Sequence, residues 1–157
     1  MSDRMPMRST ALLVGAGLLL AFAALPAAGQ DSFRLPGLAG GELTRDDLEQ
    51  GTSVVVVWAS WSPRCREIPE QVAALARDWG GRARVLTVNF QEERGAVETF
   101  LRGRSMAAPV FLDADGQFGR SYGVTNLPAL LVLREGQSLY NGRWPSDVNA
   151  LLADVLK

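Results

Sequence analysis

The chain has 157 residues, 47% of them hydrophobic and 21% charged, which is typical of a globular protein rather than a disordered one. Its 16 basic and 17 acidic residues leave a net charge of −1, so no basic excess is present to bind nucleic acid. The sequence has no histidine and a single cysteine, Cys65. This excludes Ser-His and Cys-His catalytic pairs, an internal disulfide and a zinc site built from several cysteines. No metal or cofactor is expected.

The N-terminal segment has the pattern of a secretory signal peptide. Arg4 and Arg8 precede fifteen uncharged residues at 11–25, and small residues follow up to Gly29. A membrane span needs about 20 apolar residues, so this stretch is short for one. We expect residues 1–29 to be cleaved from a periplasmic or secreted protein, leaving 157 − 29 = 128 residues as one domain. The alternative is an uncleaved inner-membrane anchor facing the periplasm, the only case in which a membrane contact is expected.

The first elements after this leader are a hairpin and two strand–helix pairs. Residues 33–48 predict a short edge hairpin followed by a turn. The β-branched run VVVVW at 54–58 is typical of a strand buried on both faces. Apolar residues then recur at helical spacing over 68–79, where two glycines end the helix. Residues 85–90 predict a second buried strand, and a helix follows over 96–101.

The rest of the chain predicts a strand–helix unit, a hairpin and a final helix. Glu92, Glu93 and Arg94 are expected to be the solvent-exposed start of the helix at 96–101. Residues 109–122 predict a short strand, a turn and a brief helix, and 130–141 predict a hairpin that turns at Glu135-Gly136. Ser146 is expected to cap a last helix that ends near Leu156. This order predicts an α/β fold with a mixed sheet covered by helices on both faces.

Residues 58–67, WASWSPRCRE, resemble the thioredoxin-fold active site of the extracytoplasmic TlpA/ResA-like family, usually written W-A-T-W-C-P-P-C-R-E. Residues 33–41 are similar to the family's N-terminal hairpin, and 109–122 lie where it inserts a strand and a helix. Residues 122–129 resemble its Y-G-V…P-T segment, whose proline is cis. The resemblance implies a thioredoxin-like domain over 30–157. It also implies a role in thiol–disulfide homeostasis or in protein and cytochrome c maturation.

The family's exchange chemistry uses two thiols, and this chain lacks the first. One thiolate attacks the substrate disulfide, and the second thiol resolves the mixed disulfide. Ser62 stands at the first position and Cys65 at the second. A hydroxyl is too weak an acid to be held as an anion by a helix dipole worth about 1 kcal/mol. The sequence therefore excludes dithiol turnover by this chain alone.

Two further departures affect the surroundings of the remaining thiol. Val56 stands where many thioredoxins bury an acid that accepts a proton from the resolving thiol. Pro69 follows Cys65 by four residues, whereas the family's helix proline follows by five. Either one residue has been deleted before this proline, or the proline bends the helix at a different place than in the family.

Cys65 and Ser62 each have a structural and a functional interpretation. Cys65 is either a small buried apolar residue or a reactive thiol. Its position after Pro63 and the neighbouring charges of Arg64 and Arg66 favour a thiolate. Ser62 is expected to be a helix N-cap rather than a nucleophile.

A substrate groove is implied by the resemblance at Trp61, Pro63, Leu127 and Pro128. Trp61 lies over the active-site surface in the family, whereas Trp58 belongs to the strand and to the core. The residue before the family's proline offers backbone hydrogen bonds to an extended segment, a form of strand addition. Leu127 could do so here without thiol chemistry, although Pro128 could instead only maintain the fold.

Three functions remain open, and whether the protein is an enzyme stays undecided. In the first, Cys65 forms mixed disulfides with a partner protein or a small thiol such as glutathione. In the second, a redox-inactive module binds an extended peptide or partner protein in the groove. The third is a one-cysteine peroxidase, because Ser62 stands three residues before Cys65, as Thr does in peroxiredoxins. That pattern also requires proline at the position of Trp58, which argues against it.

Overall fold

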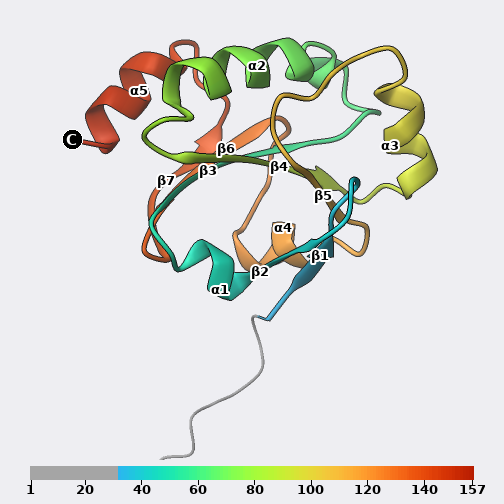
Figure 1. The fold of residues 1–157 in the computed structure, drawn as a ribbon, viewed down its shortest axis with the longest axis horizontal. Helices are drawn as coiled ribbons and strands as arrows, with labels where there is room; N and C mark the ends of the chain where they lie inside the picture. The colour runs from blue at the N-terminus through green and yellow to red at the C-terminus, as the bar shows by residue number, and fades with distance from the viewer. Residues whose placement is uncertain (1–31) are drawn as a thin grey trace, which may run out of the picture.

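A five-stranded mixed sheet forms the middle layer of the molecule (Figure 1). The computed structural model describes residues 32–157, and the predicted leader at 1–29 lies outside them. The sheet has the order β5-β4-β3-β6-β7. Its strands are β3 (Thr52–Trp58), β4 (Arg84–Phe90), β5 (Val110–Asp113), β6 (Ala129–Arg134) and β7 (Gln137–Arg143). The first three run parallel, and β6 and β7 pair antiparallel, so the sheet is mixed as predicted.

The central strand β3 is buried on both faces because helices or loops cover each side of it. Its residues from Val54 to Trp58 are 0% exposed. Successive side chains point to opposite faces of a strand, so Val56 and Trp58 enter one core while Val55 and Val57 enter the other.

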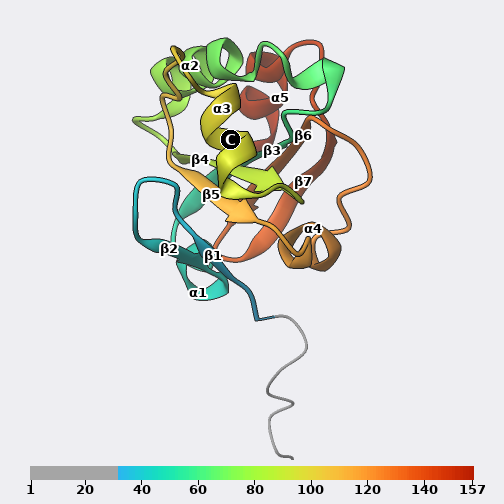
Figure 2. The ribbon, with the colours of Figure 1, turned by 90° about the vertical axis from the view of Figure 1, so that its right-hand side faces the viewer.

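Three helices cover one face of the sheet: α2 (Ile68–Trp79), α3 (Arg94–Phe100) and α5 (Val148–Val155) (Figure 2). Their buried residues include Val72, Val97 and Leu152. The N-cap of α5 is Asp147, whose side chain accepts a hydrogen bond of 2.8 Å from the N–H of Ala150. The predicted cap at Ser146 is therefore wrong by one residue.

The opposite face is covered by an N-terminal hairpin, a four-residue helix and a short helix. These are β1 (Arg34–Pro36), β2 (Glu42–Thr44), α1 (Arg45–Leu48) and α4 (Gln117–Ser121). They bury Phe33, Leu35 and Phe118 against the sheet. The N–H of Leu38 donates to the carbonyl of Val110 at 2.8 Å, which attaches the hairpin to the edge strand β5. The turn predicted after the hairpin is helical because a capping box at Thr44 begins α1 there.

A separate 3₁₀ turn, η1 (Pro63–Cys65), precedes α2 and accounts for the unusual position of Pro69. Pro69 is the second residue of α2, where the missing N–H leaves no helical hydrogen bond unmade.

None of the helices in residues 32–157 has the length and apolar character needed to span a bilayer.

Candidate functional site

Four of the predicted site residues follow the end of β3, where the chain turns into η1: Trp61, Ser62, Pro63 and Cys65. Parallel strands bring their carboxyl ends to one edge of a sheet, and β3 and β4 end there together, with Trp58 opposite Asn89. The N–H of Ser62 donates to the carbonyl of Ala59 at 3.2 Å and closes the connecting turn. The N–H of Cys65 donates to the carbonyl of Ser62 at 2.9 Å, which fixes the thiol one turn further on.

A second segment, distant in sequence, completes the site. The Leu127–Pro128 peptide bond is cis, as the resemblance implies, and it leads into β6, which pairs with β3. A groove of about 480 Å³ separates this segment from η1. It is lined by Trp61, Ser62, Pro63, Arg64, Phe90, Val124, Thr125, Asn126 and Leu127. Four of the six predicted site residues thus meet in one groove, whereas Pro128 and Cys65 are buried and do not line it.

The groove offers an exposed aromatic ring and unoccupied backbone groups. Trp61 is 61% exposed, more than any other large hydrophobic residue that the structure describes. Within the described chain, the backbone N–H of Leu127 donates no hydrogen bond and its C=O accepts none. The neighbouring Pro128 carbonyl accepts from the N–H of Trp144 at 3.1 Å. An extended segment could therefore stack on the ring and pair with the backbone of Leu127.

The thiol of Cys65 is inaccessible and held in its neutral form. Cys65 is 0% exposed to solvent. Burial raises the pKa of Cys65, while hydrogen bonds from the Ala59 backbone and the Ser62 side chain oppose the rise and the charge of Glu92 adds to it. Arg64 is exposed and is not among the groups that shift this pKa. The expected thiolate support from Arg64 and Arg66 is therefore wrong, since both side chains lie in solvent.

Ser62 begins η1, but its hydroxyl makes no capping hydrogen bond. Pro63 has no N–H, and the N–H of Cys65 already bonds to the Ser62 carbonyl. The expected side-chain cap is thus not formed. The Ser62 hydroxyl instead interacts with the Cys65 thiol, and only 7% of the residue is exposed.

A buried carboxylate, missed in the sequence, holds the turn between β3 and η1. Glu92 accepts hydrogen bonds from the Ser60 N–H at 2.7 Å, from the Ser60 hydroxyl and from the Asn89 amide at 2.6 Å. Residue 92 is therefore not a solvent-exposed helix start, because these three donors replace water around it. The signal in the sequence was its place just beyond Asn89 on a parallel strand, next to the end of β3.

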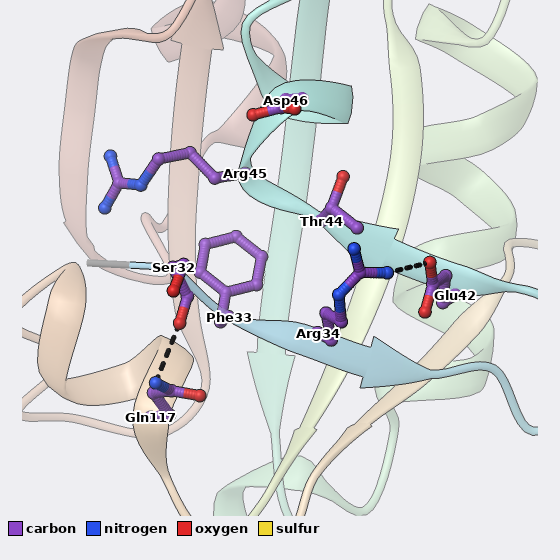
Figure 3. Close-up of a pocket in the computed structure, with 8 residues that line it drawn as sticks. All are labelled: Ser32, Phe33, Arg34, Glu42, Thr44, Arg45, Asp46 and Gln117. Carbon is purple, nitrogen blue, oxygen red and sulfur yellow. Dashed lines mark hydrogen bonds and ion pairs between the residues drawn. The ribbon is translucent and has the colours of Figure 1, made fainter. Parts of the chain in front are cut away.

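A second hollow lies on the hairpin face and contains none of the predicted site residues (Figure 3). Its Arg34 and Glu42 are paired with each other, and Gln117 donates to the Ser32 carbonyl at 2.8 Å. No three His, Cys, Asp or Glu side chains in the described residues lie where they could hold a metal ion.

Comparison with known proteins shows where this architecture occurs. A model of the AhpC/TSA family matches residues 28–139. The chain is 34% identical over 104 residues to the thiol:disulfide interchange protein DsbE of Allochromatium vinosum, covering 64% of this chain and 56% of that protein. It is 31% identical over 124 residues to DsbE of Yersinia pestis, covering 75% and 63%. The chain thus spans about three fifths of these relatives.

A solved structure assigned as DsbE from Chlorobium tepidum superposes with a TM-score of 0.69 at 28% identity, covering 80% of this chain and 91% of that one. The expected thioredoxin-like fold, a mixed central sheet with flanking helices, is thereby confirmed. The two curated relatives are named as thiol:disulfide interchange proteins.

Proposed function

Because the chain belongs to the AhpC/TSA family of thioredoxin-fold proteins, we propose that it binds an extended segment of a thiol- or disulfide-bearing partner protein without turning it over. One observation carries the proposal: the groove surface is exposed to solvent, whereas the thiol is buried. Trp61 is 61% exposed beside Leu127, whereas Cys65 is 0% exposed and Ser62 supplies no attacking sulfur.

The mixed-disulfide function is the weaker alternative. For Cys65 to react with a partner protein or a small thiol, η1 would have to open and expose the sulfur. The raised pKa of Cys65 would then also have to fall, because the thiolate is the reacting form.

We further propose that the domain at 30–157 acts outside the cytoplasm, in the periplasm or after secretion, in protein or cytochrome c maturation. The charge and hydropathy of residues 1–29 support export. Both DsbE relatives carry thiol:disulfide interchange in their names, which supports a partner with cysteines.

The test uses a thiol-blocked extended polypeptide, the alkylated B chain of insulin, added to ¹⁵N-labelled protein. We expect the indole N–H signal of Trp61, assigned with Trp61→Phe, to shift on titration. Cys65→Ala should bind equally well, because the buried thiol takes no part. Trp61→Ala, followed through the backbone amide signals of the groove because the indole is gone, should weaken binding by at least about fivefold, as expected for loss of an exposed aromatic anchor.

Leu139→Ala is the matched control, because Leu139 is also an exposed large hydrophobic residue, at 37%, and lies outside the groove. It should leave the affinity unchanged. Alkylation of native Cys65 by iodoacetamide should be negligible until urea unfolds the protein. Rapid alkylation of the native protein would favour the mixed-disulfide function. Loss of binding in Cys65→Ala would contradict the proposal by itself, because the blocked peptide cannot form a disulfide.

A further inference from the structure

The charged side chains that line the groove or bond to a lining residue are both arginines. Of the nine residues that line it, only Arg64 is charged. Arg143, at the end of β7, donates from Nε to the side-chain oxygen of Asn126 at 3.1 Å, so its guanidinium is tied to the opposite wall. Cations therefore stand on both sides of the apolar surface of Trp61 and Leu127, although the whole chain has a net charge of −1.

These two arginines are not neutralised within the described chain. Neither Arg64 nor Arg143 forms an ion pair with a carboxylate in residues 32–157. Glu92 is a buried acid two residues after Phe90 in the groove wall. Its oxygens accept three hydrogen bonds from Ser60 and Asn89, and none from either arginine.

We infer that the segment bound in this groove is acidic: an extended peptide stretch of the partner protein with Asp or Glu beside the residue that stacks on Trp61. This inference rests on the proposed function and names the partner's chemistry. Its carboxylates would pair with Arg64 on one wall and with Arg143 on the other, while its backbone pairs with Leu127. Apolar walls exclude water from the central contact, and the arginines select the charge of the flanking residues.

The test uses three blocked decapeptides of extended, otherwise uncharged sequence that differ only at a central Glu, Gln or Lys. Binding is followed by the Trp61 indole signal at low and high salt. We expect affinity in the order Glu, Gln, Lys, with the Glu peptide about fivefold tighter than the Gln peptide, as for an exposed ion pair. The difference should shrink between 50 and 500 mM NaCl, because salt screens exposed charges.

Arg64→Gln should abolish most of the preference for Glu, and Arg143→Gln should reduce it. Arg66→Gln is the matched control, because Arg66 is an exposed arginine two residues after Arg64 and lies outside the groove. Its hydrogen bond with Arg104 uses the backbone carbonyl of residue 66, which the substitution keeps. It should retain the full preference. Equal binding of the three peptides, or an equal loss in Arg66→Gln, would overturn the inference while leaving groove binding intact. Failure of all three peptides to move the Trp61 signal would overturn the proposed function as well.

Discussion

Glu92 links the groove to the sheet through one side chain. Its carboxylate joins the last part of β4 to Ser60, the residue before Trp61. In a poorly solvated site, hydrogen bonds to a charged acceptor are stronger than those between neutral groups. The orientation of Trp61 therefore depends on a residue that lies 32 positions away from Ser60 in sequence.

We expect Glu92→Ala to lower the free energy of unfolding by about 2–3 kcal/mol, because it leaves the Ser60 N–H and the Asn89 amide without their acceptor. Urea unfolding followed by circular dichroism measures the change. Glu93→Ala is the matched control, since Glu93 is the exposed next residue, and it should change stability by less than about 0.5 kcal/mol. Similar losses in both variants would contradict the structural role of Glu92.

Asp113, like Glu92, is a buried acid that accepts hydrogen bonds from a neighbouring segment, here the start of α4. It is 0% exposed, and its two carboxylate oxygens accept from the N–H groups of Phe118 at 3.0 Å and Gly119 at 2.9 Å. Burial raises the pKa of Asp113, and these two hydrogen bonds oppose the rise. The short helix α4 is thus attached to β5 through one buried acid.

Replacing Asp113 by Ala should lower the free energy of unfolding by about 1–2 kcal/mol at pH 7, as expected for loss of a helix cap. Because its pKa is raised in the fold, the folded protein holds this proton at a pH where the unfolded chain, with a value of 3.8, has lost it. The stability contributed by Asp113 should therefore grow as pH falls from 7 toward 4. Urea unfolding of wild type and variant across this range measures it, and a shrinking difference would contradict the raised pKa.

For the molecule as a whole, the fold places the side chain of residue 62 beside the single thiol of the sequence. The Ser62 side chain already interacts with the Cys65 thiol, so a sulfur at position 62 would lie next to that of Cys65. The cis bond at Leu127–Pro128 and the exposed ring of Trp61 complete the surroundings.

Ser62→Cys should therefore form a disulfide with Cys65 on oxidation and reduce insulin over repeated cycles in the presence of dithiothreitol. We expect a rate at least tenfold above that of wild type, measured as insulin turbidity with the reductant background subtracted. The double variant Ser62→Cys/Cys65→Ala should show no repeated turnover, because no second thiol resolves the mixed disulfide. Catalytic turnover by the wild-type protein would contradict the account of the site.

The order of elements follows from local pattern. The β-branched run that became β3 and the helical spacing that became α2 are properties of short stretches, and the structure reproduces both. Capping was less predictable, because Ser146 and Asp147 are adjacent acceptors and the path of the chain selects between them. The four-residue α1 was missed because helices this short lack a periodic signal.

The site divides in the same way between sequence and structure. The sequence alone establishes that no pair of thiols exists, because the identity of an atom at position 62 does not depend on folding. Whether Cys65 is exposed, whether Glu92 is solvated and which arginine borders the groove depend on segments brought together by β3, β4 and β6. Burial and pairing are properties of the surroundings rather than of the residue, so only the tertiary structure decides them.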